Sequence, residues 1–459
     1  MSSFFQKKTV AQLRADAANS NLTKNLSAWD LTFLGVGGII GAGIFVLTGI
    51  AAARYAGPAV AVSFAIAGFL CILVSLTYSE FATIVPASGS VYSYTFASLG
   101  EGMAFLCGWS LLLAYTVTAA AVAVGFTGYL SGMTASLGFV IPDYLLKTPA
   151  EGGLVNLPSI IIILILALVL IRGTKQSAKL NFILVLVTLA AIVTFVALAT
   201  PHADVTNFEP FAPFGIKGIA SGAAVVFFSY MGFDAVATSA EECKNPARDL
   251  PIGIILSILI CMALYMAVAL ALTASVNYKL LDTTEPVAYA LRLFGWGGVA
   301  NLIACGAIAG IITTLIVYLF GQSRIFFAVS RDGMLPQSIG KIHPKYHTPY
   351  LVTTIGAILI AVISGFVPLM HIVELSNTGT LGVFMVNFIG IVAMRRSHPE
   401  IPRSFRCPIL YVVAPVGFIV CGYLIYELST LTHILYAGWI ILGIIVYYCY
   451  GKKHSSLRA

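Results

Sequence analysis

The sequence contains little charge. Only 9% of its 459 residues are Asp, Glu, Lys or Arg, whereas 59% are hydrophobic. A soluble globular domain carries roughly 25% charged residues, so this chain has too little polar surface for a soluble fold of its size. We therefore expect lipid to be its solvent, with the backbone polar groups paired inside membrane-spanning elements.

Motifs for catalysis and for metal binding are also missing. The 8 cysteines form no C-x-x-C pair and most lie in apolar runs, which favours buried, inert thiols over a metal site or disulfides. The 7 histidines are scattered, and no H-E-x-x-H, G-x-S-x-G or P-loop pattern is present. The pattern disfavours an intramembrane enzyme and an ATP-driven pump, and we expect no cofactor and no metal.

The net charge of +7 does not indicate a nucleic-acid partner, because Lys and Arg sit in short segments between apolar runs. With the N-terminus on the cytoplasmic side, these residues gather in cytoplasmic segments and are scarce in the outer loops. The outer loops are short and hold no N-x-S/T sequon. We therefore expect a multi-pass protein of a bacterial cytoplasmic membrane with both termini cytoplasmic.

Long apolar runs occupy the chain almost from end to end. Each is long enough for a transmembrane helix, which needs roughly 20 apolar residues, and about 12 such helices are expected. The runs start near Leu31, Val60, Met103, Pro158, Leu180, Gly218, Pro251, Gly298, Tyr350, Ile372, Val412 and Leu431. The stretch Pro86–Glu101 is expected to be a short half-buried or interfacial piece. We expect residues 1–30 to form a polar cytoplasmic segment, and no pattern typical of a cleavable signal peptide is visible in them.

The first span is rich in glycine, at Gly35, Gly37, Gly38, Gly41 and Gly43. Each glycine weakens a helix by roughly 1 kcal/mol relative to Ala and leaves the backbone open to a ligand. The alternative interpretation is tight packing of helices through a small-residue motif.

The sixth span is interrupted by Gly232 and Asp234 within an aromatic run that begins at Phe227. A packed aromatic core is the alternative, although an unpaired carboxylate inside a membrane is costly. The first and sixth spans lie five spans apart, where inverted repeats place their broken helices. A broken helix offers N–H groups to an anion and carbonyls to a cation, so this pairing favours a zwitterionic α-amino acid as substrate.

Lys179 enters the fifth span from the cytoplasmic side. One interpretation is an interfacial lysine that reaches back to the lipid headgroups. The other is a lysine that points into the helix bundle and gains and loses a proton during transport.

Four stretches resemble the amino acid–polyamine–organocation superfamily, and in particular its cationic amino acid transporter branch. They are Gly38–Phe45, Gln176–Asn181, Glu241–Ile254 and Pro402–Pro408, in the family's order. The resemblance implies an all-α integral membrane protein with a LeuT-like fold, about 12 transmembrane helices and discontinuous helices 1 and 6. Its inverted repeats would cover about 31–200 and 218–395, within one transporter domain over 31–450. Two extra helices would lie at about 409–450, before a cytoplasmic tail over 451–459.

The same resemblance implies site residues. It places the substrate carboxylate on backbone N–H groups of Gly41, Ala42 and Gly43. It places the ammonium on backbone carbonyls of Ile39, Ile40, Phe228 and Met231. The ring of Phe228 would shield the substrate, and Lys179 matches a lysine that replaces a sodium ion in proton-coupled relatives.

One departure concerns the side-chain pocket. Relatives often read Leu-Glu-Tyr in helix three, where this chain has Leu113-Ala114-Tyr115. Asp234 is a possible substitute for that glutamate, and Gln322 and Ser323 are polar groups that would also line the pocket or gate. Whether the pocket takes arginine and lysine or small neutral amino acids stays open.

The sequence therefore predicts a proton-coupled amino acid symporter that works by alternating access, with Lys179 as the coupling residue. The alternative is an exchanger that needs neither sodium nor protons. A channel is disfavoured because neither a filter sequence nor rings of charge are visible. The expected partners are an amino acid, protons and membrane lipids.

Overall fold

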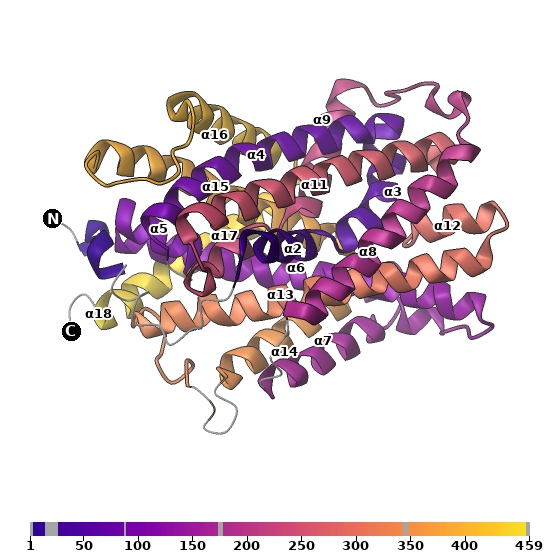
Figure 1. Ribbon diagram of the computed structural model, residues 1–459. Coiled ribbons are helices and arrows are strands. Elements are labelled where there is room, and N and C mark those ends of the chain that lie inside the picture. Colours follow the sequence, from indigo (N-terminus) through magenta and orange to yellow (C-terminus); the bar gives the residue numbers. More distant parts are fainter. Residues whose placement is uncertain are drawn as a thin grey trace.

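A computed structural model describes residues 3–13, 26–86, 89–172, 178–341, 343 and 348–455, without the side chains of 3, 178–181 and 241. Over these residues the secondary structure is helical, and the one strand-like feature is an isolated bridge between Leu26 and Cys243. The helices form one bundle in which most long axes run in the same general direction (Figure 1).

The elements fall into long, intermediate and short helices. The long ones are α4 (Val60–Ile84), α6 (Glu101–Ser136), α8 (Ala178–Ala199), α11 (Pro246–Ser275), α13 (Gly297–Arg331) and α15 (Leu369–Ser397). The intermediate ones are α2 (Ala28–Ile39), α7 (Leu157–Ile171), α9 (Gly215–Val226), α14 (Tyr350–Phe366), α16 (Leu410–Tyr426) and α17 (Thr430–Val446). The short ones include η1 (Ser3–Phe5), η2 (Gly43–Leu47), α3 (Thr48–Ala51), η3 (Ala52–Ala56), α5 (Ser90–Ser98), η9 (Phe227–Tyr230), α10 (Asp234–Thr238), α12 (Pro286–Leu293), η12 (Tyr447–Gly451) and α18 (Lys452–His454).

Among the described residues, 8 helices are long and apolar enough to cross a membrane, judged by length and composition. Shorter apolar helices include α2, α7, α14 and α16. The predicted starts lie within a few residues of the observed ones, and those of α4 and α14 coincide with Val60 and Tyr350. The largest offset is at α11, because Pro246 occupies the first turn, where its missing N–H costs nothing, ahead of the apolar run. Within the stretch Pro86–Glu101 the structure has the nine-residue helix α5, and all nine of its residues are buried, so the predicted half-buried or interfacial position is wrong for this helix.

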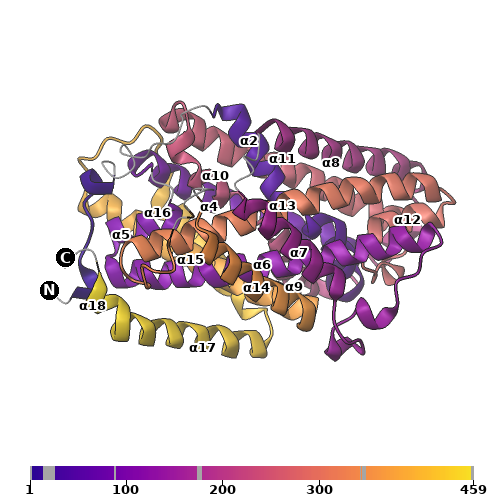
Figure 2. The same ribbon diagram turned by 90° about the horizontal axis from the view of Figure 1, so that it is seen from below.

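Helix α6 runs through the middle of the bundle and packs against α13, α14 and α15 (Figures 1 and 2). Most of its 36 residues are buried, and alanines at 119, 120, 121 and 123 let neighbouring backbones come close. By contrast, α17 runs along the margin of the bundle (Figure 2). The first and last described parts of the chain meet at one end of the bundle, where the rings of Phe4 and Tyr447 pack in a T-shaped arrangement with centroids 5.7 Å apart (Figures 1 and 2).

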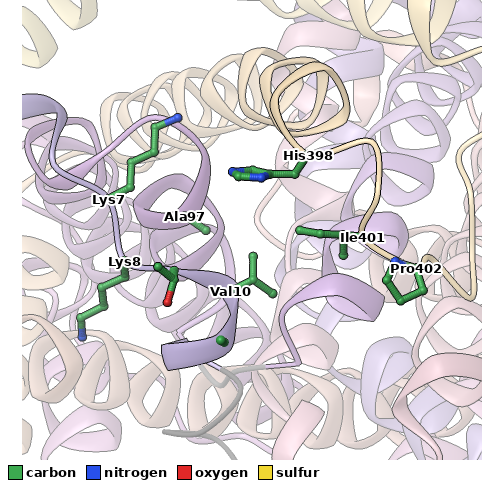
Figure 3. A pocket seen from close by; sticks show the side chains of 9 residues that line it. Lys7, Lys8, Val10, Ala97, His398, Ile401 and Pro402 are labelled. Carbon is green, nitrogen blue, oxygen red and sulfur yellow. The ribbon is translucent and has the colours of Figure 1, made fainter.

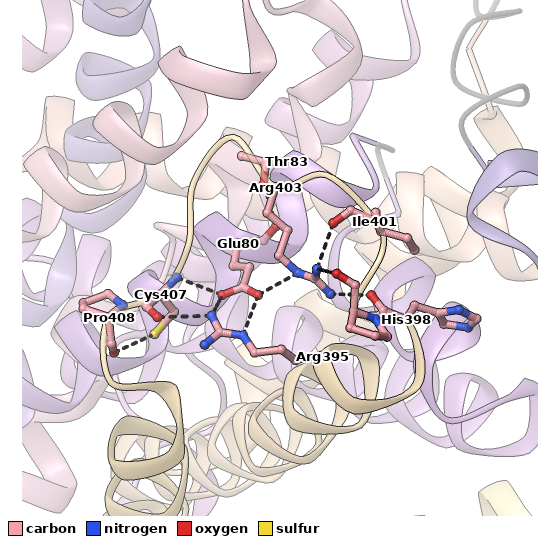
Figure 4. Close-up of polar contacts among 9 residues, drawn as sticks. Glu80, Thr83, Arg395, His398, Ile401, Arg403, Cys407 and Pro408 are labelled. Carbon is pink, nitrogen blue, oxygen red and sulfur yellow. Dashed lines mark hydrogen bonds and ion pairs between the residues drawn. The ribbon is translucent and has the colours of Figure 1, made fainter.

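A buried cluster of one acidic and two basic side chains connects the segment before α16 to the rest of the bundle (Figure 4). Glu80 on α4 is fully buried and pairs with Arg395 on α15 and with Arg403, whose Nε lies 3.1 Å from the Glu80 carboxylate. The backbone N–H of Cys407 donates to Glu80 at 2.8 Å, and Arg395 donates to the Cys407 carbonyl at 3.1 Å. The carboxylate therefore holds together two helices and a loop.

Candidate functional site

The first helix break lies between Ile39 and Gly43. Helix α2 ends at Ile39, Ile40 is extended with φ −79° and ψ 97°, and the chain resumes a helical path at Gly43. A Cβ at Gly41 would lie 2.6 Å from Thr314 Oγ1, and one at Gly43 would lie 2.5 Å from Ser229 Cα. These two glycines therefore allow neighbouring helices to touch the interrupted backbone.

The second break faces the first. The chain leaves α9 at Val226, passes through η9, and is extended at Met231 with φ −62° and ψ 146° before α10 begins. Gly232 has a φ of +116°, a conformation open mainly to glycine. A Cβ at Gly232 would also lie 2.4 Å from the Gly38 carbonyl oxygen, so the two broken segments are in direct contact.

Neighbouring helices satisfy carbonyls that the breaks release. The Tyr265 hydroxyl on α11 lies 2.9 Å from the carbonyl oxygens of both Ile39 and Ser229, and it donates its single proton to either. The Thr314 hydroxyl on α13 lies 3.3 Å from the carbonyls of Gly37 and Ile40. These two side chains are not among the residues predicted from the sequence, although an isolated polar group within an apolar helix is a signal that could have found them.

The backbone groups predicted to hold a substrate gather at these breaks and are buried. Gly41, Ala42 and Gly43 stand where a helix starts, and the first N–H groups of a helix have no partner within it. The carbonyls of Ile39 and Ile40 face Tyr265 and Thr314, as described above. The Phe228 carbonyl accepts the N–H of Met231 at 3.2 Å. Each carbonyl oxygen has a second lone pair for a further donor.

Helix α6 forms a wall that passes both breaks. A Cβ at Gly125 would lie 2.7 Å from the Ala42 Cβ, so this part of α6 abuts the first break. Near the second break, the Tyr115 hydroxyl donates a short hydrogen bond to the buried Asp234 carboxylate. No cation pairs with Asp234 among the described side chains. The ring of Tyr318 stands edge-on to Tyr115 at a centroid distance of 5.3 Å.

The other predicted pocket residues have their own partners. Gln322 donates to Thr116 through a short hydrogen bond, and Ser323 donates to the Phe320 carbonyl of its own helix at 2.7 Å. Ala114 packs toward α15, where a Cβ at Gly379 would lie 3.4 Å from the Ala114 Cβ. Tyr115 and Asp234 thus lie beside the second break, whereas Gln322 and Ser323 form their hydrogen bonds with Thr116 and Phe320.

Lys179 is the second residue of α8, and its side chain lies outside the described part of the chain. Farther along α8, Val185 and Thr188 line a small pocket beside the first break. The pocket is completed by Gly37, Ile40, Gly310 and Thr313. At 1.5 Å of rise per residue, the Lys179 backbone lies about 9 to 14 Å along the helix axis from that pocket.

Two ion pairs connect the broken helices to neighbouring elements at opposite ends. Arg324 on α13 pairs at 2.9 Å with Glu242, which follows α10, and its guanidinium stacks on the Phe320 ring. Arg54 in η3 pairs at 2.9 Å with Asp282, close to α12. Each pair bridges a part of an interrupted helix to a neighbouring element.

A separate pocket lies away from the breaks, between the N-terminal segment and the loop after α15 (Figure 3). Val10, Ala97 and Ile401 give it a largely apolar lining, and the His398 ring reaches into the space. The Lys8 amine is directed away from it, toward Asp332 at 3.1 Å. This pocket lacks the convergent backbone groups of the breaks, so the breaks remain the candidate site.

Comparison with known proteins identifies the family. The amino acid permease family model matches residues 26–448. The chain is 42% identical to the methylthioribose transporter of Bacillus subtilis (strain 168) over 100% of both chains. It is 40% identical to the branched-chain amino acid permease of the same strain over 99% of each chain. It is 36% identical to the vacuolar cationic amino acid transporter 4 of Arabidopsis thaliana, over 88% of this chain and 69% of that protein. These relatives are named as transporters or permeases, not as enzymes. This chain therefore belongs to the amino acid permease family of membrane transport proteins.

Proposed function

We propose that the chain is a secondary amino acid transporter with a LeuT-like fold and that the two facing helix breaks are its substrate site. Helix 1 would comprise α2 with η2, α3 and η3, and helix 6 would comprise α9 with η9 and α10. With the remaining long and intermediate helices, this division gives about 12 crossings of roughly 20 residues each. The contact between Gly38 and Gly232 is the observation that carries the proposal, because it brings two interrupted backbones to one point.

The chemistry of the breaks suits a zwitterion. N–H groups at Ala42 and Gly43 stand at a helix start and would receive a carboxylate, which the positive end of the helix dipole favours. Carbonyls of Ile39, Phe228 and Met231 would receive an ammonium group. A ligand that lacks either charge leaves one set of buried backbone groups without a partner, which costs binding free energy.

We propose a neutral amino acid as the substrate. Ala114 supplies no carboxylate where cationic transporters often carry a glutamate, and the buried Asp234 carboxylate beside the second break already accepts a hydrogen bond from the Tyr115 hydroxyl. The named substrate of one relative, a branched-chain amino acid, supports this choice. A second candidate substrate is methylthioribose, because the relative named for it is 42% identical over the whole chain.

Proton-coupled symport with Lys179 as the coupling residue remains part of the proposal, as does exchange without ion coupling as its alternative. The small pocket that Thr188 and Thr313 line lies beside the first break, and Thr188 is on the same helix as Lys179, so a change at Lys179 would act close to the substrate site. Substitution of Lys179 by Ala is expected to abolish uptake driven by a proton gradient while exchange survives. Concentrative uptake by the Lys179→Ala variant would contradict this role.

The experiment measures uptake of labelled leucine, arginine and methylthioribose into proteoliposomes. An inward proton gradient is imposed with sodium absent, and parallel arms add sodium or preload the vesicles with amino acid. The proposal expects leucine to accumulate and a protonophore to abolish the accumulation. Uptake that needs preloading identifies an exchanger, whereas uptake of methylthioribose alone contradicts the amino acid substrate.

For orientation, we propose a bacterial cell membrane with both termini in the cytoplasm. The distribution of Lys and Arg along the sequence supports this orientation. In that orientation the Arg324–Glu242 pair is the cytoplasmic gate and the Arg54–Asp282 pair is the outer gate.

A further inference from the structure

Three hydroxyl groups from two helices surround the side chain of Met231 at the second break. Ser376 Oγ lies 3.4 Å from the Met231 sulfur, and Thr118 Oγ1 and Thr380 Oγ1 each lie 3.7 Å from it. Thr118 belongs to α6, whereas Ser376 and Thr380 lie about one turn apart on α15. All four side chains are buried. We refer to Thr118, Ser376 and Thr380 as the hydroxyl cluster.

Each hydroxyl has one proton to donate, so the acceptors around the hydroxyl cluster decide whether all three hydroxyls are satisfied. Thr118 donates to the Ala114 carbonyl at 2.6 Å, so its proton is already used. Ser376 touches the Thr118 hydroxyl and the sulfur. For Thr380, the Met231 sulfur is the one acceptor recorded among the described residues. Because a buried hydroxyl without a partner is costly, the cluster needs an acceptor where the sulfur stands.

The hydroxyl cluster lies within the proposed substrate site. On α6, Thr118 comes between Tyr115, which bonds Asp234, and Gly125, which abuts Ala42. The backbone of Met231 belongs to the second break itself. A substrate held by its ammonium and carboxylate at the breaks would therefore extend its side chain along this part of α6.

Methionine is unbranched and has three rotatable side-chain bonds, so Met231 can vacate this position at low cost. We infer that the hydroxyl cluster is a side-chain subsite for amino acids that carry a thioether, and that the Met231 sulfur fills it when substrate is absent. The inference rests on the proposed amino acid transport and narrows its substrate class. Methionine is the simplest probe of that class.

The test compares methionine with norleucine, in which a methylene of similar size replaces the sulfur. Both compounds compete with labelled leucine for uptake into proteoliposomes that contain the full chain. Methionine is expected to inhibit at a concentration about threefold or more below that of norleucine, because only methionine offers the hydroxyls an acceptor. Equal inhibition by the two compounds would overturn the inference.

A single substitution tests whether the hydroxyl cluster causes the preference for methionine over norleucine. Thr380→Val keeps the shape of the side chain and removes the hydroxyl. In this variant methionine and norleucine are expected to inhibit at about the same concentration, because methionine inhibits less well while the inhibition by norleucine is unchanged. Thr378→Val is the matched control, because Thr378 is buried on the same helix and donates to the Glu374 carbonyl at 3.0 Å. A preference that survives in Thr380→Val, or that is lost equally in both variants, would overturn the assignment.

Failure of the proposed transport function and failure of the subsite alone would give different results. If the wild-type chain takes up none of the amino acids tested, the amino acid substrate is wrong and the subsite falls with it. If leucine is transported but methionine and norleucine compete equally, only the subsite is wrong.

Discussion

Two structural features, the backbone conformation and a close backbone contact, both require glycine at position 232. Its φ of +116° is open mainly to glycine, and a Cβ there would lie 2.4 Å from the carbonyl oxygen of Gly38. The sequence pattern indicates that this glycine interrupts the sixth span. It could not show which residue of the first span the glycine touches, because that contact depends on the packing of distant segments.

Gly232→Ala is expected to abolish leucine uptake, because the added methyl group forces the two breaks apart. Backbone strain of this kind costs roughly 1–3 kcal/mol of stability, which is measured by thermal unfolding in detergent beside the uptake assay. Gly438→Ala on α17 is the matched control, since nothing lies within 4 Å of its added Cβ. Normal uptake by Gly232→Ala would show that the breaks tolerate separation.

Tyr265 allows a second test at the scale of a single atom. Tyr265→Phe removes the donor shared by the carbonyls of Ile39 and Ser229, and we expect leucine transport to fall by about tenfold as the breaks lose their alignment. Tyr94→Phe is the control, because the buried Tyr94 hydroxyl has no hydrogen-bond partner among the described residues. Equal losses in the two variants would argue against a specific role for Tyr265.

Among the elements, the apolar runs alone predicted the helices well. The observed helices begin within a few residues of the predicted starts because length and hydropathy decide where a lipid-spanning helix lies. The side-chain pocket was harder to predict. Gln322 and Ser323 lie on α13 as expected, but their hydrogen bonds go to Thr116 and Phe320, since helix rotation decides which neighbour a polar group meets. For Lys179 the coupling role stays a prediction.

The two gate pairs belong to the scale of elements, because each connects a broken helix to a neighbour. Arg54→Ala is expected to raise, and Arg324→Ala to lower, the exposure of the breaks to the outside. The measurement is the labelling rate of Ser229→Cys, in a background without other cysteines, by an impermeant thiol reagent added outside. Changes of the same sign in both variants would contradict opposed gates. Uptake by Ser229→Cys itself is the control for an intact site.

At the scale of the whole molecule, the charge cluster around Glu80 connects α4, α15 and the segment before α16. Removing one partner of a buried ion pair leaves an uncompensated charge, so Glu80→Gln is expected to lower stability by about 3–5 kcal/mol. Asp143→Asn breaks the exposed pair with Lys147 and is expected to change stability by less than about 1 kcal/mol. Thermal unfolding in detergent measures both, and equal effects would mean that the Glu80 cluster adds no special stability.

The central claim is that the facing breaks recognise both charges of an α-amino acid, and competition by leucine analogues tests it most directly. Leucine methyl ester lacks the carboxylate, and 4-methylpentanoate lacks the ammonium group, while both keep the side chain. We expect each to inhibit counterflow of labelled leucine at least about tenfold less well than leucine, because each leaves buried backbone groups unpaired. Inhibition by either analogue at the concentration that suffices for leucine would contradict the account.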